Sequence, residues 1–519
     1  MTQNRRIILN IAATYGRSLL ALLFGLFSSR WVLMSLGQTD FGLYGVVGGI
    51  TAFIAFFNGL LSSAVSRFYA ISVGQAEVAR DHQSGLEECR HWFNIAVAIH
   101  TALPLMLMAV GYPIGEWAVR NYLIIPPDRI TACVWVFRFA CVTCLISMIN
   151  GPFSAMYYAK QYIVEITIYG FVQTTLNFLF LYFMITHPGD WLVKYAFGMC
   201  LIATIPQILI CFRAFQVFPE CRIKVGYLWS WKRFKKLGSY AFWQTFGAVG
   251  YILRGQGIAI LINRMYGPLV NTAMSIANSV NGQASMLSMS LQTAFQPAIV
   301  TKYGSGDKKG AVRLAFRACK FGLLLVLIFV IPISLELSEV MRIWLKEPPR
   351  YAVGLCWCML AILVLDKCTI GHMITVNARG KVALYQFVVG GAVILSLPLA
   401  WVFCKMGLGV YSVGWAMVVS MGISTLSRVI FARCLVSMSI QRWLFGIMIP
   451  IGFCTVVISS LAYLLQFAMP PSFVRVCLTT GIVEVLLIPF VWNVVLDTSE
   501  KEFVKARIYN FALKFRQAR

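Results

Sequence analysis

The sequence predicts an all-α, polytopic membrane protein, and three observations lead to that fold class. Apolar residues make up 59% of the 519 residues and charged residues only 12%, whereas soluble globular domains average about 25% charged residues. The mean hydropathy is +0.76. The 44 Lys and Arg residues separate long apolar runs instead of gathering in one water-facing domain. Together these features exclude a soluble enzyme, a disordered chain and a secreted disulfide scaffold.

The apolar runs are long enough for helices that cross the hydrocarbon core of a bilayer, which takes about 20 residues. Transmembrane strands are not expected, because the runs lack the period-two alternation of a lipid-facing barrel. Fourteen spans are predicted, at 7–36, 42–66, 93–117, 129–150, 163–186, 192–212, 237–262, 269–300, 315–337, 351–375, 382–404, 410–433, 443–467 and 473–496.

The basic residues predict the orientation of these spans. Loops on the side of the two termini hold 29 Lys and Arg residues, and loops on the opposite side hold 9. Because positively charged loops stay in the cytoplasm, both termini are predicted to be cytoplasmic. Basic residues spread in this way do not form a nucleic-acid surface, so nucleic acid is not an expected partner. The N-terminal apolar run is too long for a signal-peptide core and is expected to be retained.

An internal duplication is predicted from the order of the spans. Six spans precede a basic tract and six follow it, and both halves start on the cytoplasmic side, as in a parallel repeat. The predicted division is an N-terminal lobe at 1–212, a basic cytoplasmic linker at 213–236, a C-terminal lobe at 237–433, and two further helices with a basic tail at 434–519. A shift of 230 residues also superimposes three pairs of small residues: Gly37 on Gly267, Ala64 on Ala294, and Gly74 on Gly304.

Several charged residues lie inside the predicted spans, where a cation near the bilayer centre costs about 2.5–3.5 kcal/mol. Arg428 is close enough to its helix end to be expected to reach the cytoplasmic interface, and Glu165 is expected to be interfacial. Asp366 and Lys367 are about 100° apart on a helix and are not expected to form a self-contained pair. The charged residues assigned to spans instead of loops are Arg17, Arg30, Arg138, Arg254, Lys367 and Arg428, with the acids Glu165, Asp366 and Glu484.

Cations exceed acids in this set, and a membrane cavity with surplus fixed positive charge favours an anion such as phosphate. The alternative is a set of structural ion pairs between helices. Asp366 is the one deep acid expected to be placed to bind a proton or Na⁺. The predicted site for a pyrophosphate group consists of Arg17, Arg30, Arg138, Arg254 and Lys367.

Uncharged polar residues are dense in the seventh and eighth predicted spans. They suit a cavity lining that hydrogen-bonds a glycan, although polar side chains also hold membrane helices together. The candidates for glycan lining are Gln244, Gln256, Asn263, Asn271, Asn278 and Asn281.

No catalytic or metal site is predicted. The sequence has no P-loop, no GxSxG and no HExxH motif, so neither an enzymatic activity nor a cofactor is expected. Cys141 and Cys144 have CxxC spacing but no accompanying histidine, and they are expected to be buried thiols. His372 is the one histidine predicted to be embedded, and it is expected to be packed or interfacial.

Two runs resemble a known family. The first is SSRWVLMSLGQTDFGLYGVVGGITAFIAFFNGLLSSAVSRF at 28–68, and the second begins LINRMYGPLVNTAMSIANSV at 261–280. They resemble polysaccharide-biosynthesis flippases, the Wzx-type branch of the MATE-like (MOP) exporter superfamily. Thr272 and Met274 depart from the family's commoner small-and-basic pair. The residues that fill the pattern are Asn263, Gly267, Pro268, Asn271, Ala273, Pro297, Lys302 and Tyr303.

The resemblance implies a V-shaped pair of six-helix lobes with alternating access, in the inner membrane of a bacterium. The implied function is movement of an undecaprenyl-pyrophosphate-linked oligosaccharide from the cytoplasmic to the periplasmic leaflet, for O-antigen- or capsule-like polysaccharide. Membrane lipids, a polysaccharide polymerase and glycosyltransferases are the implied partners. The alternatives are a cation-coupled exporter of drugs or metabolites, which needs an acid-rich lobe, and a membrane-embedded glycan polymerase, ligase or assembly scaffold. Glu484 does not fit the apolar groove that the last two helices could offer a lipid tail.

Overall fold

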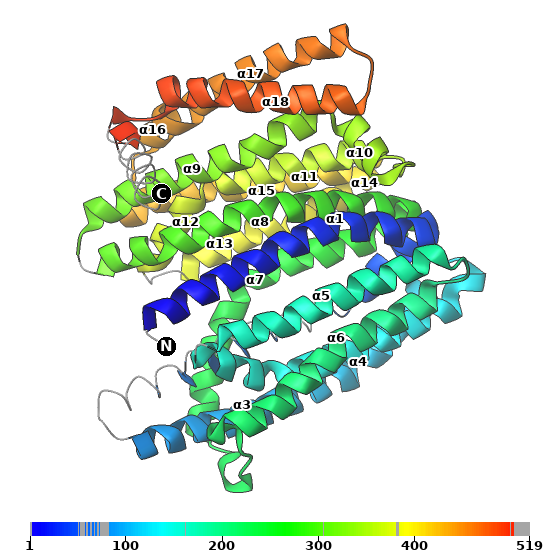
Figure 1. Cartoon of the computed structure of the whole chain (residues 1–519), viewed down its shortest axis with the longest axis vertical. Helices are drawn as coiled ribbons and strands as arrows, with labels where there is room; N and C mark the ends of the chain where they lie inside the picture. Colours follow the sequence, from blue (N-terminus) through cyan, green and yellow to red (C-terminus); the bar gives the residue numbers. More distant parts are fainter. Residues whose placement is uncertain are drawn as a thin grey trace, which may run out of the picture. The chain divides into compact units, whose positions relative to one another are not determined.

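The computed structural model describes residues 3–49, 51, 58, 61–62, 65–66, 68–69, 72, 82–160, 162–304, 306–379, 383–498 and 500–502, although some side chains within these ranges, including those of 3–23 and 238–249, lie outside the description. This part of the chain contains helices and no strands (Figure 1). The α-helices are α1 (Gln3–Gly49), α3 (His82–Trp117), α4 (Ile130–Ala159), α5 (Ile163–Thr186), α6 (Leu192–Val217), α7 (Trp231–Tyr266), α8 (Pro268–Gly304), α9 (Lys308–Leu335), α10 (Leu337–Leu345), α11 (Ala352–Lys367), α12 (Ile370–Arg379), α13 (Ala383–Ile394), α14 (Ser396–Lys405), α15 (Tyr411–Val436), α16 (Ile440–Trp443), α17 (Ile449–Ala468) and α18 (Phe473–Phe490). Short 3₁₀ or π turns are η1 (Ala118–Tyr122), η2 (Pro127–Arg129), η3 (Pro219–Cys221), η4 (Val225–Tyr227), η5 (Leu444–Met448) and η6 (Val491–Val495).

Among the described residues, nine helical segments are long and apolar enough to cross a membrane, or ten if α11 and α12 form one broken span. These segments coincide with ten of the fourteen predicted spans. The ten are the spans from 93–117 to 473–496, with the spans at 237–262 and 269–300 omitted. The two omitted spans and the first two predicted spans include residues or side chains outside the described part. The protein is therefore a multi-pass membrane protein, and the total of fourteen spans stays a prediction.

The chain forms two compact units. The first unit consists of residues 1–279, 349–355 and 390–420, and the second unit consists of residues 280–348, 356–389 and 421–519. In the first unit, α4 packs against α3, α5 and α6, and α1 packs against α4, α5 and α7. The predicted linker at 213–236 lies within this unit, and the predicted six-plus-six division stays a prediction.

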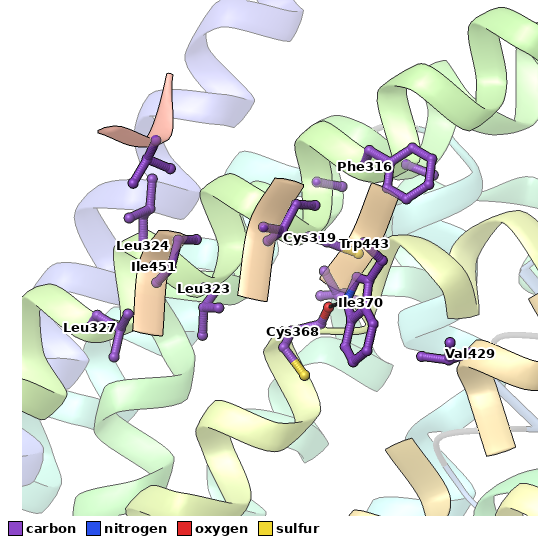
Figure 2. Packing of buried hydrophobic residues seen from close by; sticks show 14 of the residues in the cluster. Phe316, Cys319, Leu323, Leu324, Leu327, Cys368, Ile370, Val429, Trp443 and Ile451 are labelled. Carbon is purple, nitrogen blue, oxygen red and sulfur yellow. Dashed lines mark hydrogen bonds between the residues drawn. The ribbon is translucent and has the colours of Figure 1, made fainter. Parts of the chain in front are cut away.

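In the second unit, α9 is the central helix. It packs against α10, α12, α17 and α18, and α17 and α18 lie side by side (Figure 1). Figure 2 shows the buried cluster that these helices share, with Phe316, Cys319 and Leu323 of α9 near Ile370 and Trp443. The burial and close packing of these side chains hold the helices in place, and the helices in turn position the charged groups described below.

Two glycines give the same backbone turn at the positions that the 230-residue shift superimposes. Gly37 kinks α1 with φ 74° and ψ 170°, and Gly267 ends α7 with φ 81° and ψ −176°. That region of φ and ψ is open essentially to glycine alone. Thr272, one of the departures from the family pattern, is fully buried and donates its hydroxyl to the carbonyl of Gln38. Ala64 and Gly74 lie outside the described residues. The structures of the two halves can therefore be compared at only one of the three superimposed pairs, Gly37 and Gly267.

The predicted linker is fastened to the helices of the first unit. Glu220 is buried and its carboxylate lies 2.7 Å from the Lys160 ammonium. The Asn94 amide oxygen accepts a 2.7 Å hydrogen bond from the Lys224 backbone N–H, and its amide nitrogen donates to the Arg222 carbonyl at 3.1 Å. The tract is therefore a docked loop, although Trp229 and Trp231 remain exposed on it.

Candidate functional site

Arg138, a predicted cation of the first unit, shares an acid with a second arginine. Its guanidinium lies 3.3 Å from the Glu116 carboxylate and donates a 3.1 Å hydrogen bond to the Tyr112 hydroxyl. The same Glu116 oxygen lies 2.8 Å from Arg120. The guanidinium of Arg138 also stacks over Trp135 at 5.1 Å. One carboxylate thus serves two guanidinium groups, which leaves one positive charge in excess.

Glu116 was not among the acids predicted inside spans. It is the second-to-last residue of the predicted span at 93–117, and the structure continues the apolar helix through α3 and η1 to Tyr122. A carboxylate this close to a predicted span end is readily taken for an interfacial group, although the helix continues beyond it. The spacing of Glu116 and Arg120, four residues apart on one helix face, is the signal in the sequence that suggests the pair.

The other predicted cations of the first unit lie on α1 and α7. Arg30 is half-buried on α1 and forms no ion pair with any acid in the described part of the chain. Arg254 lies on α7 with its guanidinium 5.5 Å from the Tyr251 ring centroid. Arg17 lies on α1, and its side chain is outside the described part.

The polar residues predicted to line a glycan site differ in their surroundings. Both amide atoms of Asn263 bond to the backbone of Ile124, at 2.8 Å and 3.3 Å, and the side chain is fully buried. This geometry fits the packing alternative. Asn271 is buried with an amide nitrogen that has no partner among the described residues. Asn278 is exposed.

The remaining members of that set are half-buried or outside the description. Gln256 packs against α1 at Gly49, where a larger residue would meet its amide oxygen. Asn281 belongs to the second unit, and its amide oxygen is buried without a partner in the described part. Gln244 has a side chain outside the described residues.

An arginine next to the start of α4 joins three segments of the first unit. The Arg129 guanidinium lies 3.3 Å from Asp40 and 2.6 Å from Asp190. Partial burial favours the neutral form of the Asp190 carboxyl, but the hydrogen bond from Arg129 and the Leu192 backbone N–H outweigh it and lower the pKa of Asp190. Asp190 is exposed and Arg129 is half-buried, and these contacts hold the three segments together.

The second unit holds a charged cluster at the break between α11 and α12, which bend by 46°. The Asp366 carboxylate lies 2.9 Å from the Arg428 guanidinium through one oxygen and 2.8 Å from the Lys367 ammonium through the other. Arg428 is 1% exposed and also contacts the Thr369 hydroxyl at 3.3 Å. Again one acid serves two cations.

This cluster tests two predictions. Arg428 does not reach the interface, because Asp366 and Thr369 supply partners for its guanidinium inside the unit. Asp366 and Lys367 contact each other despite their helical offset, because Lys367 is the last residue of α11, but the pair is not self-contained, as predicted, since Arg428 shares the carboxylate. Helical offset alone is a poor guide at a helix terminus.

The break between α11 and α12 is held by side chains from neighbouring helices. A helix end leaves carbonyl groups without intrahelical partners, and burying them unpaired is costly. Thr425 of α15 donates to the Leu365 carbonyl at 3.0 Å, and Trp443 of α16 donates to the Cys368 carbonyl at 2.9 Å. The unwound turn is therefore satisfied by tertiary contacts that no local pattern specifies.

His372 follows the break and is packed, one of the two alternatives expected for it. It is 1% exposed, with a ring nitrogen 3.4 Å from the Cys319 sulfur. The rings of Phe316 and Trp443 meet it edge-on, at 6.2 Å and 5.9 Å between centroids. No group of three metal-ligating side chains occurs among the described residues.

Three other acids differ in their partners and exposure. Glu336 is buried against Arg475 at 2.7 Å and accepts a 3.0 Å hydrogen bond from Thr479, and neither Glu336 nor Arg475 was predicted as a charge inside a span. Glu165 lies 3.1 Å from Arg213 in a partly exposed pair, and its interfacial position stays a prediction. Glu484 is exposed midway along α18.

No protein-family model matches the sequence, and no curated protein matches it. Solved transporter structures share its fold at low sequence identity. An inward-facing multidrug resistance MATE family transporter of the MOP superfamily has a TM-score of 0.63 and 13% identity, covering 80% of this chain and 94% of its own. The lipid II flippase MurJ, in an inward closed conformation, has a TM-score of 0.57 and 14% identity, covering 93% of this chain and 98% of its own.

A MOP superfamily transporter from Pyrococcus furiosus, described as having a binding pocket of reverse polarity that suggests a different function, has a TM-score of 0.51 and 14% identity. It covers 83% of this chain and 94% of its own. At these identities the likeness shows the fold and not the activity. The chain thus has the fold shared by MATE transporters and the lipid II flippase, and the polysaccharide branch of that superfamily stays a prediction.

Proposed function

We propose that this protein is a flippase that moves an undecaprenyl-pyrophosphate-linked oligosaccharide from the cytoplasmic to the periplasmic leaflet. The observation that carries the proposal is the excess of positive charge on membrane-spanning helices. Glu116 is shared by Arg120 and Arg138, and Asp366 is shared by Lys367 and Arg428. A pyrophosphate supplies the negative charge that such groups lack, and arginine suits its geometry.

The structural comparisons support a lipid-linked substrate over a free one. The lipid II flippase covers 93% of this chain, whereas the MATE transporter covers 80%. The fuller coverage favours the lipid flippase as the guide to the substrate class. Arg30, Arg138, Arg254 and Lys367, with Arg17, are the proposed pyrophosphate ligands, and Gln256, Asn278 and Asn281 are the proposed glycan contacts.

Binding of the anion is proposed to change the relative stability of two transport states. A ligand shifts such an equilibrium only by the difference in its affinity for the two states. Pyrophosphate screens the repulsion among like charges, so the state that brings these cations nearest to the anion gains most from binding. Asp366 already serves two cations, so a coupling proton or Na⁺ has to compete with Lys367 and Arg428.

The proposal is tested by removing the excess charge. A variant carrying Arg138→Gln, Arg254→Gln and Lys367→Gln is expected to lose transport, by about tenfold for each lost charge-assisted contact. Glycan display in cells and leaflet transfer of a fluorescent lipid-linked glycan in liposomes are the two measurements. The matched control carries Arg213→Gln, Lys309→Gln and Arg433→Gln, three exposed cations, and is expected to transport normally.

The two assays separate the possible failures. A triple variant that is well expressed and transports at the normal rate would show that the site assignment is wrong. Wild-type protein that transfers no lipid-linked glycan in liposomes would show that the function is wrong and favour an assembly scaffold. The MATE likeness also supports a second candidate, a cation-coupled exporter, and efflux of a cationic dye from the same liposomes would identify it.

A further inference from the structure

The second unit contains a cavity of about 340 Å³. None of the residues of the Asp366 cluster lines it. It is formed where α9 and the α16–η5–α17 segment begin and where η6 ends. Three apolar spans thus start or finish around it. A cavity at the shared ends of spans lies at the membrane surface, on the side predicted to be cytoplasmic. We call it the α9–α16 pocket.

Basic groups outnumber acids in this pocket. Its lining includes four basic side chains, Arg313, Arg317, Lys320 and Arg442, but two acidic ones, Asp497 and Glu500. The acids are already engaged. Lys320, itself 4% exposed, lies 2.8 Å from Glu500 and 3.4 Å from Asp497. Arg317 lies 3.6 Å from Glu500.

Arg313 and Arg442 have no direct ion pair with any residue that the structure describes. Among those residues, only Arg313 has an acid, Asp307, acting on it at longer range. Arg442 is held instead by Phe316, with its guanidinium carbon 5.3 Å from the ring centroid. This stacking fixes the guanidinium beside the cavity while leaving its N–H groups available.

The walls of the pocket favour a small ligand with an apolar attachment. Its volume is at the low end of ligand cavities, about 300–1,000 Å³, which suits one phosphate-bearing group. Gly446 lies in the lining, and a Cβ built there would meet only Arg442 at 3.9 Å. Exposed apolar side chains at Phe445, Ile449 and Phe453, four residues apart, continue from the pocket along α17.

We propose that the α9–α16 pocket binds the phosphate group of an anionic phospholipid. Arg313 and Arg442 bind the phosphate oxygens, and Lys320 with its two acids forms the floor. Basic pockets between transmembrane helices on the cytoplasmic side suit such headgroups, because the lipid surface there is negative. The site goes beyond the proposed transport function, since none of its lining residues belongs to the proposed pyrophosphate ligands.

Lipid binding to the full-length protein in detergent tests this proposal. The protein is titrated with phosphatidylglycerol or with phosphatidylcholine, and bound lipids are counted by native mass spectrometry. Wild-type protein is expected to retain one phosphatidylglycerol that phosphatidylcholine does not displace. The variant Arg313→Gln with Arg442→Gln is expected to bind phosphatidylglycerol about tenfold more weakly or worse, because it loses two charge-assisted contacts.

The matched control is Lys309→Gln with Arg433→Gln, which removes the same charge on the same predicted side but leaves the pocket lining intact. The single variant Arg313→Gln, at an exposed position without an ion pair, guards against loss of folding. Equal phosphatidylglycerol affinity in the pocket variants and the control would overturn the proposal. Competition by inorganic phosphate distinguishes the sources: displacement of the lipid at millimolar phosphate assigns the site to free phosphate instead of a headgroup and overturns the lipid assignment.

Discussion

At the scale of single residues, Asp366 decides how the second unit tolerates its buried cations. Its two carboxylate oxygens separately serve Arg428 and Lys367. Arg428 is 1% exposed, so water cannot replace the carboxylate as its partner. The sequence placed all three residues inside spans, but it expected Arg428 to reach the interface and could not pair the charges. Pairing depends on how α15 packs beside the end of α11, and that packing leaves no mark in local hydropathy.

Replacing Asp366 by Asn is expected to destabilise the protein by about 3 kcal/mol, because removing one partner leaves a buried guanidinium uncompensated. Thermal unfolding in detergent measures the loss as a lower midpoint temperature. Glu484→Gln is the matched control, since this acid lies on a membrane helix but is exposed. A midpoint for Asp366→Asn that stays as close to wild type as that of Glu484→Gln would show that the Arg428 contact contributes little.

At the scale of elements, hydropathy located the helices but missed how two of them end. The predicted span at 351–375 is apolar on average, and an average over about 20 residues cannot reveal one unwound turn. The structure breaks it between Lys367 and Ile370, where Thr425 and Trp443 satisfy the freed carbonyls. In contrast, Gly37 and Gly267 were visible from sequence, because a turn that requires positive φ selects glycine.

Replacing Gly267 by alanine is predicted to change the free energy of unfolding in the opposite direction to the same replacement at a nearby glycine. Gly267→Ala is expected to destabilise the protein by about 1–3 kcal/mol, because alanine is strained at φ 81° and ψ −176°. Gly255→Ala, within the same helix and with open space around its Cβ position, is expected to be neutral or to stabilise by up to about 1 kcal/mol. Chemical unfolding of the two variants measures both effects. Equal shifts would contradict the role given to the turn.

At the scale of the whole molecule, composition was sufficient for the fold class and insufficient for the site. Ten of the predicted spans coincide with apolar helices because bilayer thickness fixes their length. The candidate site depends on which charges lie near one another, and that is tertiary information. Glu116 shows the limit, since it lies inside the predicted span at 93–117 and yet nothing in the sequence identified it as the partner of Arg138. Composition predicts the substrate even less well than the site, because transporters of different function share the fold.

The direction of transport depends on the orientation of the chain, which positive-inside counting predicts and thiol labelling can measure. In a background with the two exposed cysteines replaced, Cys434→Ser and Cys477→Ser, one reporter cysteine is placed at Gly189→Cys and another, in a separate variant, at Lys309→Cys. Both positions are exposed, and neither residue forms an ion pair in the described part of the chain. A membrane-impermeant maleimide added to spheroplasts is expected to label the cysteine at 189 and to reach the one at 309 only after the membrane is permeabilised. The reverse pattern would place the basic loops outside, contradict the positive-inside assignment, and move the α9–α16 pocket to the outer leaflet, where a negative lipid surface no longer explains its four basic side chains.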